Sequence, residues 1–278
     1  MITSGKDKFF GVLKYIALIF FAFCCLYPII WLFLSSFKTN AELYTNPWGL
    51  PKSFTLANYV QAITEGHILQ YFGNSVIIAI SAVVVAVILS SMASYAISRM
   101  DWKLSKVTMS IFLLGMMIPV YAMIIPLFSM FNSMGLLNSR LSVIITHIAI
   151  SFPMAIFIMT GFYRSIPREL EEAAVMDGCS IYRIFFSIIL PIAKSSIVTV
   201  AVINFINVWN DLLLPQIFLT DTAKMTLPVG LTEFQGRYST NYVAEIAAVM
   251  ITIIPSIIVY IWLHNHIMEG MAAGAVKG

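Results

Sequence analysis

Long, almost uncharged apolar segments limit the possible folds of this chain more than any other feature of its sequence. A helix needs about 20 predominantly apolar residues to cross a hydrocarbon core about 30 Å thick, because each residue adds about 1.5 Å. We place six spans, at residues 12–34, 72–97, 107–131, 141–162, 184–219 and 243–263. The fifth is too long for one straight helix, so we expect it to be broken or to lie partly outside the bilayer, with Pro191 and Pro215 as plausible breakpoints.

The composition indicates that lipid is the solvent for most of the chain. Hydrophobic residues make up 60% of the 278 residues and charged residues only 10%, whereas soluble domains carry about 25% charged residues. The first apolar run is uncharged from Tyr15 to Phe37, longer than the apolar core of a signal peptide, so we expect it to be retained. The sequence therefore predicts an all-α, polytopic membrane protein with six transmembrane helices in one transmembrane domain, residues 1–278.

The basic residues are distributed unevenly between the two sets of loops. If the N-terminus is cytoplasmic, eleven of the sixteen Lys and Arg residues lie inside, namely Lys6, Lys8, Lys14, Arg99, Lys103, Lys106, Arg164, Arg168, Arg183, Lys194 and Lys277. The other five, Lys38, Lys52, Arg140, Lys224 and Arg237, then lie outside. Cytoplasmic loops of membrane proteins carry an excess of Lys and Arg. We therefore expect both termini in the cytoplasm.

The largest inner loop, residues 163–183, carries the only dense cluster of charges in the sequence. Pro167 suits the first turn of a helix, where a missing N–H costs nothing, and the glutamates that follow it favour a helix N-terminus. Gly178 suits the left-handed position that ends a helix, and a second helix is expected over residues 181–190. The residues alone leave two interpretations open, an ordinary solvated loop helix or an element that docks a partner.

The order of residues in this loop resembles a known motif. Glu172-Ala-Ala-x-x-x-Gly178, followed by Ile189-x-Pro191, closely resembles the EAA loop of permeases in binding-protein-dependent ABC importers. The wider resemblance is to the carbohydrate-uptake branch, in particular the second permease of maltose-type systems. It covers most of the chain, with Phe37-Lys38, Leu50-Pro51, Asn58-Tyr59, Asn74-Ser75, Ser94-Tyr95-Ala96, Arg99, Ile118-Pro119, Pro126-Leu127, Gly135-Leu136, Ile166-Pro167-x-Glu169-Leu170 and Trp209-Asn210-Asp211. Two places depart from the family pattern, Cys179 in place of an alanine and the run His264-Asn265-His266.

The resemblance implies a type I ABC importer permease fold in the bacterial cytoplasmic membrane. In that family the EAA loop, here residues 163–183, forms a coupling helix that docks on a cytoplasmic ATPase dimer. Carried over, Glu172 would pair with a basic group of the ATPase, Ala173 and Ala174 would permit close approach, and Asp177 and Gly178 would shape the turn. The chain contains no Walker motif, so ATP and Mg²⁺ would be bound by the ATPase, and this chain would bind no cofactor and be no enzyme.

Three further partners follow from the resemblance: a second, homologous permease subunit, an extracytoplasmic solute-binding protein and a sugar, with an oligosaccharide favoured. Nothing in the sequence indicates a nucleic-acid partner. The outer loop at residues 221–241 would contact the solute-binding protein through Phe234, Gln235 and Tyr238, with Pro228 and Gly230 forming turns.

A polar stripe interrupts the fifth span. Asn204, Asn207, Asn210 and Asp211 fall within a sector of about 120° on a helix. Such a stripe either lines a pathway for a hydroxyl-rich solute or fixes helix packing through hydrogen bonds between helices. In maltose-type systems the partner permease holds the sugar, which leaves lining and gating to this subunit.

Two other classes of function compete with this interpretation. A secondary transporter or channel is disfavoured because the sequence shows no inverted repeats of the broken-helix type and no buried carboxylate–basic pairs for ion coupling within the spans, where Asp211 is the only acid well inside. An intramembrane enzyme is disfavoured because motifs such as H-E-x-x-H and G-x-S-x-G do not occur. The four histidines are not spaced as a metal site, and an interfacial or packing role is expected for His264 and His266.

Overall fold

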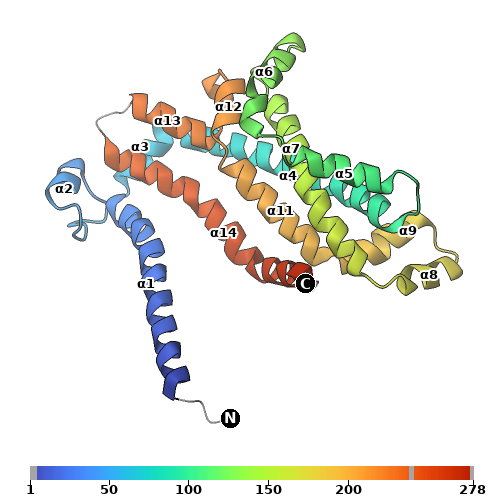
Figure 1. Cartoon of the computed structure of the whole chain (residues 1–278). Coiled ribbons are helices and arrows are strands. Elements are labelled where there is room, and N and C mark those ends of the chain that lie inside the picture. The colour runs from blue at the N-terminus through green and yellow to red at the C-terminus, as the bar shows by residue number, and fades with distance from the viewer. Residues whose placement is uncertain (1–4, 238–240, 276–278) are drawn as a thin grey trace. The chain divides into compact units, whose positions relative to one another are not determined.

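The computed structural model describes residues 5–237 and 241–275, and within these ranges every regular element is helical (Figure 1). The chain forms two compact units. The first consists of Met1–Ile68 with Leu231–Ile253, and the second of Leu69–Gly230 with Ile254–Gly278.

Four of the described helices are long and apolar enough to cross a membrane singly. They are Phe9–Ser35 within α1 (Gly5–Ser35), α4 (Ile68–Arg99), α7 (Arg140–Ser165), and Tyr242–Trp262 within α14 (Tyr242–Ala275). The spans placed from the sequence at 12–34, 72–97, 141–162 and 243–263 lie within or largely within these helices. Two bent pairs of helices raise the possible number of spans to six.

In the first unit, α1 has an apolar surface that the chain itself leaves uncovered. None of its most apolar 18-residue window is buried. The same unit contains the short helices α2 (Asn40–Thr45) and α3 (Ala57–Thr64). A helix that is apolar all round requires lipid or another subunit around it.

A polar junction ties the end of α1 to α2 and α3. Lys38 is only 1% exposed, and its Nζ donates hydrogen bonds to the carbonyl oxygens of Asn46 and Pro47, both at 3.0 Å. The side-chain amide of Asn58 donates to the carbonyl oxygens of Ser36 and Lys38. Because a buried charge without partners is costly, these bonds fix the course of the chain after α1. Two of the short motifs noted in the sequence, Phe37-Lys38 and Asn58-Tyr59, therefore meet in this junction.

The second unit is built around α7. It contains α5 (Ser105–Gly115), α6 (Ile124–Ser133), α8 (Glu169–Met176), α9 (Ile181–Ile184), α10 (Leu190–Ile192), α11 (Lys194–Trp209), α12 (Leu213–Phe218) and the start of α13 (Leu227–Arg237). α7 packs against α5, α11 and α12. Helices far apart in the sequence therefore share one central partner.

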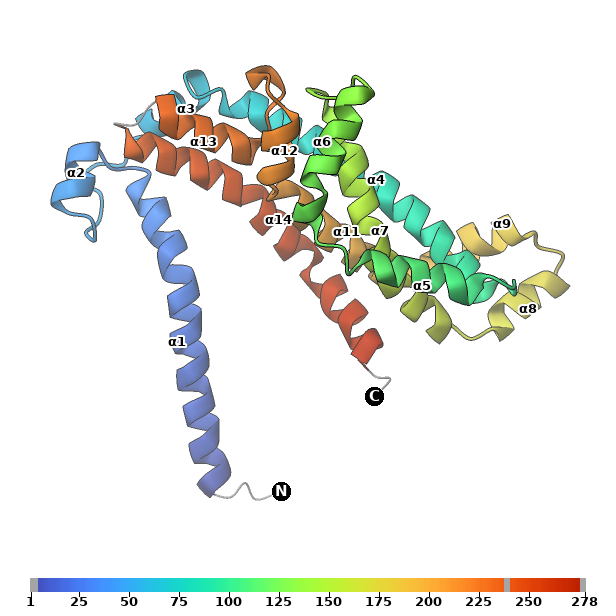
Figure 2. The ribbon, with the colours of Figure 1, turned by 45° about the horizontal axis from the view of Figure 1, so that its top comes forward.

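The third expected span, residues 107–131, is a bent pair rather than one helix. α5 and the segment Val120–Ser133 meet at 88° (Figure 2). Residues 116–119 between them are not helical. Pro119 explains the break, because a proline disfavours helical backbone at the residue before it.

The fifth expected span, residues 184–219, is broken at two places, and neither is an expected proline. The helical segments Ile181–Ile192 and Lys194–Trp209 meet at 75° around Ala193, and residues 210–212 separate α11 from α12. Pro191 lies inside the continuous segment Ile181–Ile192, two residues before the first break, and Pro215 lies in the first turn of α12, after the second break. The breaks are therefore near the two prolines but not at them, and at Pro215 the reason is that a first turn needs no N–H from a proline.

Candidate functional site

The loop between α7 and α9 contains a short helix, α8, with a closed C-terminal end. Gly178 has a φ of +75°. The N–H groups of Gly178 and Cys179 donate hydrogen bonds to the carbonyl oxygens of Val175 and Ala174, both at 2.9 Å. Together these bonds form a Schellman motif, in which the residue after the cap is left-handed. The left-handed conformation expected for Gly178 is confirmed.

Gly178→Ala should destabilise the protein by roughly 1–2 kcal/mol, because an L side chain is strained at positive φ. Gly161 in α7 is a matched control. A Cβ meets nothing within 4 Å at either glycine, and only Gly178 has a positive φ. Gly161→Ala should therefore leave stability unchanged or raise it slightly. Thermal unfolding of the purified protein in detergent checks both variants, and equal melting temperatures would contradict the assignment of strain to Gly178.

The residues expected to meet an ATPase differ in exposure. Glu172, Ala173, Asp177 and Gly178 are exposed. Ala174 is only 6% exposed and belongs to an apolar cluster of the chain itself, whose larger members include Tyr163, Ile184 and Phe185. Of the two alanines, only Ala173 therefore presents a low, open surface to a partner.

A buried ion pair fixes α8 to the ends of two long helices. Nε of Arg99, the last residue of α4, donates to Oε2 of Glu171 at 2.7 Å, and the side chains are 3% and 15% exposed. Nη1 of Arg99 also donates to the carbonyl oxygens of Tyr163 and Ile166 at the end of α7, at 3.2 and 2.9 Å. One guanidinium group thus holds the ends of α4, α7 and α8 together. These bonds therefore connect α8 directly to two of the long apolar helices.

Sequence reasoning assigned no role to this pair. The sequence marks Arg99 as a motif residue at the end of a span and Glu171 as one of three acidic residues near the start of a helix. Which glutamate meets Arg99 depends on how α8 is turned about its axis, and the spacing of charges does not determine this. The sequence signal that could indicate such a pair is an arginine at the end of a span, followed later in the chain by a loop rich in acidic residues.

The polar stripe of the fifth span lies on a cavity. Asn204, Asn207, Asn210 and Asp211 all line a cavity of about 860 Å³ in the second unit. Its wall includes residues 119–121, at the break between α5 and α6, and residues 210–212, at the break between α11 and α12. At membrane depth, irregular backbone is tolerated only where protein buries it or where it lines a water-filled cavity. The two helix breaks and the polar stripe therefore line the same cavity.

A histidine from α7 faces the acidic end of the stripe. Nε2 of His147 lies 3.1 Å from Oδ2 of Asp211, and the two side chains are 7% and 16% exposed. Oδ1 of Asp211 accepts a hydrogen bond at 3.1 Å from the N–H of Leu213, the first residue of α12. α7 thus brings His147 to a carboxylate that is distant in sequence, a proximity that the sequence did not indicate.

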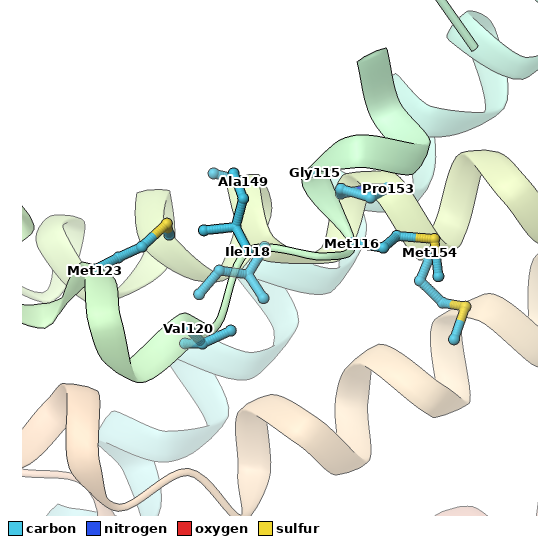
Figure 3. A pocket seen from close by; sticks show the side chains of 9 residues that line it. Gly115, Met116, Ile118, Val120, Met123, Ala149, Pro153 and Met154 are labelled. Atoms are coloured by element: carbon cyan, nitrogen blue, oxygen red, sulfur yellow. The ribbon is translucent and has the colours of Figure 1, made fainter. Parts of the chain in front are cut away.

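A smaller, apolar cavity of about 350 Å³ adjoins the polar one and shares Val120, Ile150 and Met154 with it. Figure 3 shows Ile118 and Val120, from the break between α5 and α6, near Ala149 of α7. Its lining side chains are apolar, and only the methionine sulfurs among them can accept a hydrogen bond, weakly. This cavity therefore offers no polar binding surface.

The loop between α12 and α13, which is the first part of the expected outer loop, is fixed to the starts of α4 and α7. The side-chain amide of Asn74 donates to the carbonyl oxygens of Ala223 and Met225, at 3.0 and 2.8 Å. Oδ1 of Asn74 accepts from Nε of Arg140 at 3.0 Å, and Nζ of Lys224 donates to the carbonyl oxygen of Asn138. Hydrogen bonds therefore hold this segment in place within the second unit.

The turns expected at Pro228 and Gly230 are not present, because both residues lie in the first turn of α13. A proline is tolerated there. Gly230 permits close packing, since a Cβ at this position would overlap the ring of Tyr71. The backbones of Phe234 and Gln235 lie in α13, but their side chains and the whole of Tyr238 lie outside the described residues, as do the side chains of His264 and His266.

Comparison with known proteins assigns the family. Residues 86–271 match the family model described as "Binding-protein-dependent transport system inner membrane component". The chain is 32% identical to a diacetylchitobiose uptake system permease protein of Streptomyces coelicolor, over 99% of this chain and 92% of that protein. It is 35% identical to an arabinooligosaccharides transport system permease protein of Halalkalibacterium halodurans, over 93% of this chain and 94% of that protein.

The fold agrees with a solved structure. The chain matches a protein in the crystal structure of a bacterial ABC transporter involved in the import of the acidic polysaccharide alginate, with a TM-score of 0.83 and 27% identity, over 95% of this chain and 99% of that one. The family match, the apolar helices and this likeness agree with one another. The chain belongs to the binding-protein-dependent transport system inner membrane components and is a multi-pass permease component of an ABC transporter.

Proposed function

We propose that this chain is one of two homologous permease subunits of an ATP-driven importer for an oligosaccharide in the bacterial cytoplasmic membrane. The relatives in the comparison are named for diacetylchitobiose, arabinooligosaccharides and alginate. The cavity beside α11 supports a sugar as solute, because amide, carboxylate and imidazole groups suit hydroxyl groups. The exposed apolar surface of α1 supports the proposal that this helix contacts lipid and the second permease subunit.

In this proposal α8 is the coupling element. Glu172, Ala173, Asp177 and Gly178 form its exposed surface for a cytoplasmic ATPase dimer, which binds ATP and Mg²⁺, while Ala174 is covered by the chain itself. Both chain termini then lie in the cytoplasm. The observation that carries the coupling role is the Arg99–Glu171 pair, since it connects α8 to α4 and α7 through buried bonds.

An extracytoplasmic solute-binding protein delivers the sugar, and Phe234, Gln235 and Tyr238 are its contact residues. Support comes from the outer loop, whose first part is anchored by Asn74 and Arg140 and so presents α13 from a fixed base. A cysteine at Gln235 should crosslink to the solute-binding protein when ATP is trapped on the ATPase, and less in the resting state. Crosslinking in neither state, with transport intact, would show that α13 is only a cap of the bundle.

Co-purification tests the assignment of partners. Expressed with its cognate ATPase and a second permease subunit, the chain should purify as a complex whose ATP hydrolysis rises when sugar-loaded solute-binding protein is added. A chain that purifies alone, and that transports without any ATPase, would overturn the proposal.

A further inference from the structure

We propose that residues 46–51, between α2 and α3, form a membrane anchor that inserts Trp48 and Leu50 into the outer leaflet of the lipid bilayer beside α1. The partner of this surface is lipid, at the boundary between phospholipid headgroups and acyl chains. The inference goes beyond the proposed function and takes from it only the orientation of the chain, with Ser35 at the outer end of α1.

The first support is the position of Trp48 along α1. The centroid of its ring lies 6.2 Å from that of Tyr27, with the rings stacked, and 5.9 Å from that of Trp31. Nε1 of Trp31 donates a hydrogen bond to the carbonyl oxygen of Pro47 at 2.8 Å. Tyr27 and Trp31 precede Ser35, the last residue of α1, by about 12 and 6 Å at 1.5 Å per residue. The segment therefore returns along a helix that is long and apolar enough to cross a membrane (Figure 1).

The second support is the way in which polar backbone groups of this segment are satisfied. Nζ of the buried Lys38 donates to the carbonyl oxygens of Asn46 and Pro47, and the N–H of Gly49 donates to Oδ1 of Asn46 at 3.0 Å. A Cβ at Gly49 would overlap the Asn46 side chain, so only glycine lets this turn close. At membrane depth, irregular backbone is tolerated where its polar groups have partners within the protein. The bonds of this turn provide such partners.

The third support is the apolar side chains that this turn presents. Trp48 is 72% exposed and Leu50 is 70% exposed, and residues 43–51 contain no charged side chain. Tryptophan is enriched where a membrane meets water, because its ring is apolar and its N–H is polar. α1, on which the segment lies, has its most apolar window uncovered as well. The exposed surface of the segment therefore continues an apolar surface of α1.

The charges on either side of the segment favour lipid over a protein partner. Glu42 is only 8% exposed, and its Oε1 accepts a hydrogen bond from the N–H of Lys52 at 2.7 Å. The side chain of Lys52 is exposed. A lysine beside an apolar surface extends its ammonium group to the polar boundary of the membrane, where lipid phosphate groups are found. A water-soluble partner would have to enter the membrane to reach side chains beside Tyr27.

Fluorescence quenching of the complete complex in nanodiscs tests this placement. Leu50→Cys, labelled with bimane, is the main probe because it leaves Trp48 and its ring contacts with α1 in place. Trp48→Cys is a second probe of the same segment. Glu65→Cys is the matched control, since it labels an exposed charged residue at the end of α3 in the same unit. In all three variants the native cysteines are replaced by alanine, namely Cys24, Cys25 and Cys179.

We expect the labels at positions 48 and 50 to be quenched several-fold more strongly by phospholipids brominated near the headgroup end of their acyl chains than by iodide in the water. The label at position 65 should show the reverse order, because a charged residue there faces water.

Two results would overturn the inference. Quenching at positions 48 and 50 by iodide alone would place the segment in water. Quenching there by neither agent would show that protein covers the segment, with the second permease subunit as its occupant. Failure of the proposed function is a separate result, since a complex that shows the expected lipid quenching but imports no sugar with ATP would leave the anchor in place.

Discussion

Replacing Arg99 with methionine should abolish sugar-stimulated ATP hydrolysis and lower the thermal stability of the permease. The substitution leaves the Glu171 carboxylate buried without its partner and removes the donors to the carbonyl oxygens of Tyr163 and Ile166. Breaking a buried pair by removing one partner costs about 3–5 kcal/mol. Without these interactions, we expect a movement of α8 not to be transmitted to α4 and α7.

Two further variants make this result specific. In Arg99→Met with Glu171→Leu, no buried charge is left alone, so the melting temperature should recover in part while coupling stays impaired. Arg168→Met removes an arginine whose side chain is 56% exposed and which lies 3.7 Å from Asp101. Exposed pairs contribute little, so its stability should stay close to that of the wild type. An Arg99→Met complex with normal stability and normal stimulation would contradict the role assigned to the pair.

Replacing Glu172 with alanine should uncouple the ATPase without unfolding the permease. Glu172 is exposed on α8, and within the described part of the chain no side-chain hydrogen bond or ion pair engages its carboxylate. Its removal should therefore leave the melting temperature unchanged. At an interface, the loss of one partner of a charge pair costs about 2–5 kcal/mol, so affinity for the ATPase should fall at least about tenfold.

Glu169→Ala is the matched control for this experiment. It removes the same charge from another exposed position in the first turn of α8. Co-purification of the ATPase and sugar-stimulated hydrolysis should fall much further in Glu172→Ala than in Glu169→Ala. Equal losses would show a general charge effect near the helix N-terminus, and wild-type stimulation in Glu172→Ala would contradict the coupling role.

The sequence predicts features that depend on local composition. Apolar length identifies the regions of α1, α4, α7 and α14, because a span is a property of about 20 consecutive residues. The left-handed Gly178 is predictable for the same reason, since a helix end depends on a few neighbouring residues. The breaks are only partly predictable. A proline excludes certain backbone conformations but does not decide whether the helix ends before it or begins with it.

Features that depend on contacts between distant helices were not predictable. His147 and Asp211 meet only because α7 packs beside the end of α11. Arg99 selects Glu171 rather than a neighbouring glutamate because the apolar cluster around Ala174 sets the rotation of α8. The sequence places the stripe from Asn204 to Asp211 on one side of a helix, and the structure adds the cavity that this side lines.

The central claim is that this chain moves a sugar across a membrane through a permease driven by ATP hydrolysis on a partner subunit. Uptake of a labelled neutral oligosaccharide into proteoliposomes tests it, with the complete complex in the membrane, loaded solute-binding protein outside and ATP and Mg²⁺ inside. We expect uptake that requires ATP, is lost in Glu172→Ala, and is unaffected when proton and sodium gradients are collapsed. Uptake driven by an ion gradient without ATP would instead identify a secondary transporter and contradict the account.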